Sequence, residues 1–219
     1  MFENLKKLVI AENQKYLDHD VAWIKAGHDS DADAGLRYHS TATRWQQYQS
    51  GEITREQAIS YAIKRAAKKA DKRLSQKLDK LERISTAPET LNGAIYVEWR
   101  RNYAWGYNPA AELCANTGRS YGYASGCGYD KLSAACAEAL NNNDGVLKAI
   151  YSLKDTALQE NPEITSHQAL GYGSGYTALP YFEGGVGQST LNRILEKAGY
   201  SVNWHSAKHY DTITFSKNS

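Results

Sequence analysis

Cys127 has the residue type and the setting that favour nucleophilic chemistry. It lies between Gly126 and Gly128, just before a segment with helical periodicity, and a helix N-terminus lowers the pKa of a thiol. Nucleophilic catalysis also needs a base and a group that orients it, for which the candidates are His167, His205, His209, Asp130 and Asp211. Their spacing matches no established nucleophile motif, and cysteine is commonly a small buried residue. Both interpretations of Cys127 stay open.

Two groups of residues resemble metal-binding patterns but lack features that such sites need. A zinc site would require the widely scattered set Cys114, Cys127, Cys136, His205 and His209. The sequence DSDAD at 29–33 resembles the start of a calcium loop, but the glycine that should follow and the glutamate at the twelfth loop position are missing. We therefore predict no metal site and no cofactor, and expect these aspartates to cap a helix.

Two glycine-rich segments, 122–140 and 182–199, share one design. In each, glycines precede helical periodicity, and the free N–H groups of a helix N-terminus favour an anion or a carbonyl. The second segment contains EGGVGQST, which resembles a phosphate-binding loop. Gln188 stands where that loop needs its lysine, so we do not expect nucleotide hydrolysis.

Residues 54–84 are predicted to form one long helix. Thr54 and Gln57 have the spacing of a capping box, in which each side chain satisfies a free backbone N–H of the other residue. Apolar residues then recur in steps of three and four, which is typical of a coiled-coil-like seam and would allow a homodimer. The seam residues are Ile59, Ile63, Ala67, Ala70, Leu74, Leu78 and Leu81.

The other faces of this helix are basic, because residues 64–83 hold nine lysines and arginines against three acidic residues. Such a run is often only a solvated helix face. Clustered positive charge is also the usual electrostatic signature of nucleic-acid contact. The candidate DNA- or RNA-binding residues here are Lys64, Arg65, Lys68, Lys69, Lys72, Arg73 and Lys77.

A second candidate nucleic-acid surface is the segment RRNYAWGY at 100–107. Bases stack on aromatic rings while arginines hold phosphates, although an aromatic-rich strand edge with packed arginines has the same composition. The candidate residues are Arg100, Arg101, Tyr103, Trp105 and Tyr107, and Lys131 could add a phosphate contact at the first glycine-rich segment.

The chain changes character near residues 86–90. Before this segment, helical periodicity predicts helices over 2–26, 36–49 and 54–84. After it, alternation predicts strands over 94–99, 110–117 and 119–125, with a loop over 100–109 between the first two and a terminal hairpin over 200–205 and 209–215. Further helices are expected over 132–140, 146–159 and 191–197. We predict an α+β fold, with a coiled-coil-like helical region at 1–86 and a small antiparallel-sheet domain at 91–219.

Size and composition limit the class of protein. The chain has 219 residues, a formal net charge of +2, three cysteines and sixteen tyrosines. No apolar run approaches the length of a membrane span, and we expect no membrane partner. The cysteines form no CxxC pair, and residues 1–11 do not resemble a signal peptide, so the cytoplasm is the expected location.

Three motifs together carry a resemblance to known proteins: WGYNP at 105–109, ASGCGYDK at 124–131 and EGGVG at 183–187. The sequence from about 95 to 215 resembles a group of uncharacterised proteins of bacteriophages and conjugative elements in Firmicutes and other gut bacteria. Such elements encode many small anti-defence proteins, including inhibitors of CRISPR nucleases. The resemblance implies an anti-CRISPR-like or accessory role in the cytoplasm of a bacterial host.

The sequence thus favours a non-catalytic protein that binds DNA, RNA or a host CRISPR-type nucleoprotein complex. Two alternatives stay open. One is a small enzyme that uses Cys127 with a histidine, and the other is a structural module that dimerises through the seam over 59–81.

Overall fold

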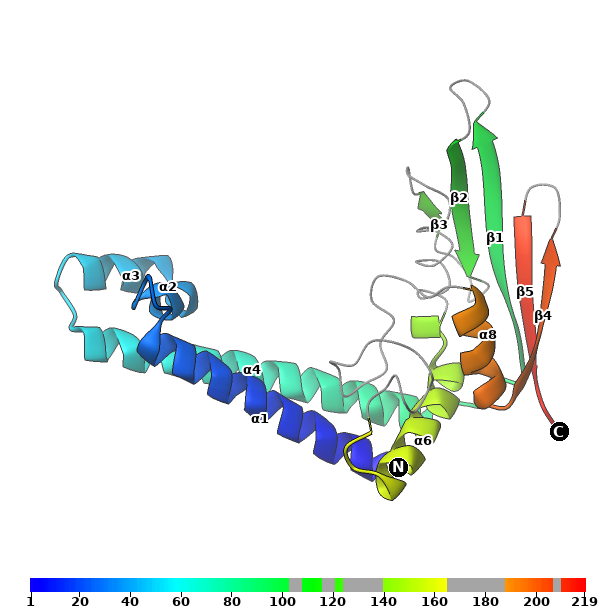
Figure 1. Cartoon of the computed structure of the whole chain (residues 1–219), viewed down its shortest axis with the longest axis horizontal. Helices are drawn as coiled ribbons and strands as arrows, with labels where there is room; N and C mark the ends of the chain where they lie inside the picture. Colours follow the sequence, from blue (N-terminus) through cyan, green and yellow to red (C-terminus); the bar gives the residue numbers. More distant parts are fainter. Residues whose placement is uncertain (103–107, 116–120, 124–139, 165–187, 207–209) are drawn as a thin grey trace. The chain divides into compact units, whose positions relative to one another are not determined.

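The computed structural model describes residues 1–102, 108–115, 121–123, 140–164, 188–206 and 210–219. The described helices are α1 (Glu3–Ala26), α2 (Ala34–His39), α3 (Ala42–Gln49), α4 (Arg55–Thr86), α6 (Asp144–Glu160) and α8 (Gln188–Lys197). The described strands are β1 (Asn92–Asn102), β2 (Asn108–Ala115), β3 (Tyr121–Tyr123), β4 (Tyr200–Ser206) and β5 (Tyr210–Lys217). Helices therefore fill the first part of the chain and an antiparallel sheet follows (Figure 1), which confirms the predicted α+β class.

The chain forms two compact units. The helical unit consists of residues 6–80, and the sheet unit consists of residues 1–5 and 81–219. The division falls within α4, a few residues before the segment 86–90 where the sequence changes character.

The core of the helical unit contains Ile24 of α1, Leu36 of α2 and the alanines Ala58, Ala62 and Ala66 of α4. These alanines recur every four residues, so they lie along one face of the helix. The first part of the predicted seam is therefore displaced: Ile59 and Ile63 are only partly buried and pack against this core. Ala70 and Leu81 of the predicted seam are fully buried. The alanine stripe packs within the chain because small side chains let neighbouring helices approach closely. A homodimer through the seam stays a prediction.

The helix predicted over 36–49 is two helices, α2 and α3. Ser40 and Thr41 both adopt extended backbone, with ψ of 158°. The Thr41 hydroxyl accepts a hydrogen bond from the Arg44 backbone N–H at 3.3 Å, so Thr41 is the N-cap of α3. The prediction of one continuous helix was wrong because it gave this capping residue no weight against the apolar periodicity.

The sheet has the strand order β3-β2-β1-β5-β4, and every pairing is antiparallel. β1 pairs with β2 from Ile95↔Ala115 to Asn102↔Asn108, so strand pairing continues into the segment 100–109 that was predicted to be a loop. Pro109 has no N–H to donate to a neighbouring strand. β3 pairs only with Glu112–Cys114, so the start of β2, which contains Pro109, has β1 as its one described neighbour and tolerates a proline.

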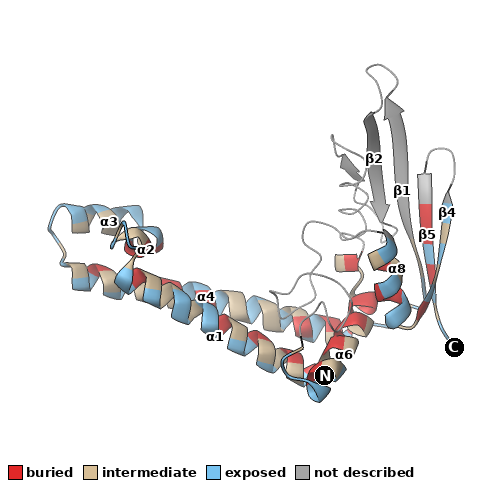
Figure 2. Cartoon of the chain, viewed as in Figure 1, coloured by how far each residue is buried: buried red, intermediate tan, exposed pale blue. Residues whose placement is uncertain are grey.

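The core of the sheet unit is formed by one face of α6, by α8 and by the terminal hairpin. Buried residues (red in Figure 2) recur along α6 and include Val146, Leu147, Ile150 and Tyr151. In β5, Ile213 and Phe215 are buried while Thr214 and Ser216 are exposed, which is the alternation of a sheet with one covered face. Leu191, Ile194 and Leu195 of α8, Ala198 immediately after this helix and Tyr200 of β4 complete this core.

Candidate nucleic-acid interface

The start of α4 is fixed by the predicted capping box. The Thr54 backbone N–H donates to Gln57 Oε1 at 2.9 Å, and the Gln57 backbone N–H donates to Thr54 Oγ1 at 3.2 Å. Both bonds satisfy N–H groups that have no partner within the helix. This confirms the capping box and begins the helix that carries the basic residues.

Three of the seven candidate cations on α4 are used inside the helical unit. Arg65 Nη1 donates to the backbone carbonyls of His39 at 3.1 Å and Ser40 at 3.3 Å, where α2 ends. The Arg73 guanidinium lies 5.6 Å from the centre of the Tyr16 ring, and Lys77 Nζ pairs with Glu12 Oε2 at 3.0 Å. These side chains therefore fasten α4 to the rest of the unit.

The other four candidates, Lys64, Lys68, Lys69 and Lys72, are exposed. Among the described residues none of their ammonium groups has an ion pair or a hydrogen bond. Lys64, Lys68 and Lys72 are spaced four residues apart, which places them on one face of α4. Asp71 is the acidic residue within 64–72. We call Lys64, Lys68, Lys69 and Lys72 the lysine cluster, and together they present positive charge to solvent.

An aromatic ring and a guanidinium lie beside the lysine cluster. Tyr61 precedes Lys64 by three residues and is 39% exposed. The Arg44 guanidinium of α3 lies 4.1 Å from the centre of the Tyr61 ring, and Arg44 Nη1 donates to Gln47 Oε1 at 2.8 Å. Neither residue was among the predicted site residues, although Tyr61 has the helical spacing from Lys64 and Lys68 that places the three on one face of α4.

Tyr38 at the end of α2 is another exposed aromatic residue, with 66% of its surface accessible. It rests against Trp23 of α1, with ring centres 5.2 Å apart, and against His39 at 5.0 Å. Gly35 allows this arrangement, because a Cβ there would lie 2.2 Å from the Trp23 carbonyl oxygen. Tyr38 was not among the predicted site residues.

Asp33 ties α3 and α4 to the connector between α1 and α2. Its carboxylate accepts from Arg55 Nε at 2.9 Å and from the Tyr48 hydroxyl at 2.8 Å. Burial raises the pKa of Asp33, but the hydrogen bonds from Arg55 and Tyr48 outweigh it and lower the pKa overall. Asp33 was expected to cap a helix; although it occupies the N-cap position of α2, its side chain makes no capping hydrogen bond.

His39 is buried beneath Trp23 and Tyr38, and its Nε2 lies 3.7 Å from Asp20 Oδ1. Burial lowers the pKa of His39; the Asp20 carboxylate opposes this, while the charges of Lys69 and Arg65 add to it. The imidazole supports the Tyr38 ring edge-on, with ring centres 5.0 Å apart and planes at 73°.

The second candidate surface is only partly described. Arg100 and Arg101 lie in β1, opposite Ala110 and Pro109 of β2. Tyr103, Trp105, Tyr107 and Lys131 lie outside the described residues, so this candidate surface stays a prediction.

The candidate nucleophilic site also lies mostly outside the described residues: Cys127, Asp130, His167 and His209 all do, as does Cys136. His205 is an exposed residue of β4 opposite Thr212, and Asp211 of β5 is opposite Ser206. Cys114 lies in β2 opposite Tyr96 and Tyr121. Within the described residues, no three His, Cys, Asp or Glu side chains are grouped to hold a metal ion.

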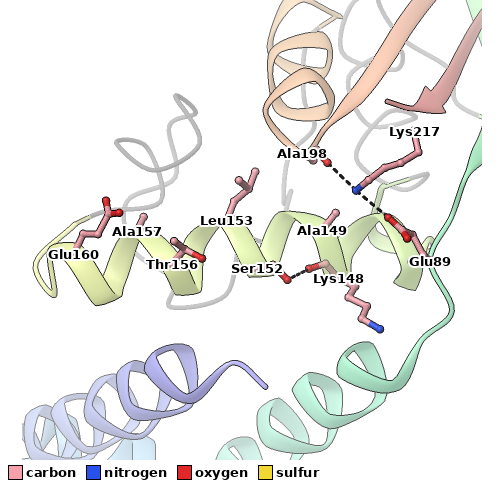
Figure 3. Close-up of a pocket in the computed structure, with 11 residues that line it drawn as sticks. Glu89, Lys148, Ala149, Ser152, Leu153, Thr156, Ala157, Glu160, Ala198 and Lys217 are labelled. Atoms are coloured by element: carbon pink, nitrogen blue, oxygen red, sulfur yellow. Dashed lines mark hydrogen bonds and ion pairs between the residues drawn. The ribbon is translucent and has the colours of Figure 1, made fainter. Parts of the chain in front are cut away.

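A groove of about 610 Å³ follows α6 in the sheet unit (Figure 3). Lys217 at its rim pairs with Glu89 at 3.0 Å and donates to the Ala198 carbonyl at 3.3 Å. The Ser152 hydroxyl donates to the Lys148 carbonyl at 2.8 Å. These polar groups of the described lining are therefore paired with each other or with the backbone.

Comparisons with protein-family models, with curated proteins and with solved structures gave no match. None of the described helices combines the length and the apolar character that crossing a membrane requires.

Proposed function

We propose that this protein binds nucleic acid through the lysine cluster on α4. The observation that carries the proposal is that some basic residues of α4 have partners within the helical unit and others do not. Arg65, Arg73 and Lys77 have partners inside the helical unit, whereas Lys64, Lys68, Lys69 and Lys72 point to solvent without an ion pair among the described residues. A helix face of this kind favours a polyanion, because phosphates replace solvent as the counter-charge.

The physical signature of such binding is its salt dependence. Each lysine that neutralises a phosphate releases condensed counterions, so the logarithm of the association constant falls linearly with the logarithm of salt concentration. The slope is about 0.7 per contact for single strands and about 0.9 for duplex DNA. Four contacts therefore predict a slope near 3, and a loss of affinity of more than tenfold between about 50 and about 200 mM salt.

Fluorescence anisotropy with labelled DNA and RNA tests the proposal. We expect binding by the wild-type chain, and we expect the variant Lys64→Gln/Lys68→Gln/Lys69→Gln/Lys72→Gln to lose both the affinity and most of the slope. Circular dichroism should show equal helix content in the two proteins, since exposed lysine and glutamine have similar helix propensities. Absence of binding by the wild-type chain at low salt would refute the proposal.

We also propose, on the resemblance of residues 95–215 to phage and conjugative-element proteins, that this binding serves an anti-defence role. The partner would be a host CRISPR-type nucleoprotein complex, approached through its nucleic acid. A CRISPR interference assay in bacteria checks this role: the wild-type chain should relieve interference and the glutamine variant should not. Interference that is unchanged by the wild-type chain would refute the anti-defence role, and binding in the anisotropy assay would still support nucleic-acid binding.

A further inference from the structure

We infer that the helical unit binds single-stranded nucleic acid in preference to duplex, with bases stacked on Tyr61 and Tyr38 and phosphates held by the lysine cluster. This inference rests on the proposed function, because it specifies which nucleic acid the lysines hold. Its evidence is separate: two exposed rings, each with a fixed neighbour, close to the same turns of α4.

Tyr61 is held in a position suited to stacking. It lies on α4, and Arg44 of α3 covers its ring at 4.1 Å while the hydrogen bond to Gln47 fixes the guanidinium. Planar guanidinium groups and tyrosine rings are both platforms on which bases stack. The residue remains 39% exposed in this arrangement, so Arg44 and Tyr61 together form a cationic stacking pair.

Tyr38 offers a second platform. The residue is 66% exposed, and its ring is supported by Trp23 and His39, with ring centres 5.2 and 5.0 Å away. A fully solvated tyrosine at a helix end would lose side-chain entropy on binding. Here the aromatic neighbours have already restricted the ring, which lowers that cost.

Arg65 connects α4, which carries Tyr61 and the lysine cluster, to the end of α2, which carries Tyr38. It follows Tyr61 by one helical turn, and its guanidinium donates to the carbonyl of His39, the residue after Tyr38. Lys64, Lys68 and Lys69 occupy the same turns of α4 as Arg65. Tyr61, Lys64 and Lys68 therefore lie on neighbouring turns of α4, and Arg65 connects this helix to the end of α2 beside Tyr38. Exposed rings combined with lysines are what holds a single strand, by stacking and by phosphate contacts.

The exposed tyrosine rings favour binding of a single strand over binding of a duplex. In a duplex the faces of the bases are stacked on each other, so an exposed tyrosine on a rigid helix has no base face to contact. In a single strand each base has a free face, and stacking on an aromatic ring is worth roughly tenfold or more in affinity per base. Lysines alone would not favour the single strand, because duplex DNA has the higher charge density.

The test compares Tyr61→Leu with Tyr61→Phe by anisotropy, using single-stranded DNA, single-stranded RNA and duplex DNA of about 12 nucleotides. Phenylalanine keeps the ring under Arg44, and leucine removes it while keeping an apolar side chain on α4. We expect Tyr61→Leu to weaken single-strand binding about tenfold, and Tyr61→Phe to weaken it less than twofold. Duplex binding and the salt slope should be unchanged in both. Tyr38→Leu should reproduce the selective loss at a site distant in sequence.

The outcomes separate the inference from the proposed function. Duplex binding equal to or tighter than single-strand binding, or a leucine variant that binds every probe like the wild type, would overturn the inference and leave the lysine cluster as a general polyanion site. A leucine variant that weakens duplex and single strand equally would also overturn it. Absence of binding to every probe would overturn both proposals. The DNA and RNA arms identify which single strand is held more tightly.

Discussion

At the scale of single residues, Lys154 places an amine inside the sheet unit. Only 1% of the residue is exposed, and its Nζ donates to the Ile164 carbonyl at 2.7 Å. Burial lowers the pKa of Lys154 from 10.5 to about 8. The unfolded chain therefore binds this proton more tightly than the folded chain does, and between pH 8 and 10.5 the folded protein gains stability as the pH rises.

The substitution Lys154→Met should remove this pH dependence and stabilise the protein near neutral pH. Methionine fills a similar volume without an amine to desolvate, and the shift corresponds to at most about 3 kcal/mol. Urea unfolding near pH 7 should show a higher free energy of unfolding for Lys154→Met. Near pH 10 the difference from the wild type should shrink. A variant that is less stable near pH 7 would mean that the Ile164 hydrogen bond outweighs the cost of burying the amine.

The sequence predicts which residues carry a charge, but it does not predict which partners those side chains bind. Lys68 and Arg65 look equivalent in a charge count, and their difference arises only because the end of α2 lies within reach of Arg65. Likewise Asp33 has the composition of a helix cap, yet Arg55 and Tyr48, which are distant in sequence, take its carboxylate. Partners far apart along the chain decide which charges remain for a ligand, and periodicity carries no information about them.

At the scale of elements, helix ends with a local cause were predictable. The capping box at Thr54 begins α4, and Gly199, with a φ of +84°, ends α8 as expected of a residue that tolerates the left-handed conformation. In the first turns of α4 the buried stripe was displaced by one residue, because alanine is weakly apolar and the adjacent isoleucines dominated the pattern, whereas Ala70 and Leu81 are buried as predicted. Packing between α1, α2 and α4 selects the alanines, which allow a closer approach.

The contact between α2 and α1 gives a prediction at this scale. A Cβ on residue 35 would lie 2.2 Å from the Trp23 carbonyl oxygen and 2.8 Å from the Ile24 backbone nitrogen, and backbone atoms cannot move aside as a side chain can. Gly35→Ala should therefore push α2 away from α1 and cost about 1 to 3 kcal/mol of stability.

Thermal unfolding followed by circular dichroism measures the loss of stability in Gly35→Ala. Gly51→Ala is the comparison, because a Cβ there meets no atom within 4 Å although its φ of +80° adds a backbone cost. A Gly35→Ala variant as stable as the wild type would show that α2 does not rest on the α1 backbone. Since α2 carries Tyr38, the same substitution should also weaken single-strand binding.

At the scale of the whole molecule, binding that depends on where the lysines lie can be distinguished from binding that depends on the net charge of the chain. The chain carries a net charge of only +2, so a general attraction to polyanions is weak and the local field of the lysine cluster must supply the affinity. Replacing Lys64, Lys68, Lys69 and Lys72 with glutamine lowers the net charge by four. Replacing four other exposed lysines, Lys7, Lys15, Lys25 and Lys197, lowers it by the same amount and leaves the cluster intact.

If the cluster holds the phosphates, the second variant should retain nearly all of the salt slope and most of the affinity, because only lysines that neutralise a phosphate contribute to the slope and none of these four belongs to the cluster. The first variant should lose both. Anisotropy titrations of the two variants over the same salt series distinguish the cases. Equal losses in the two variants would assign binding to net charge alone, and would remove the reason to place the site on α4.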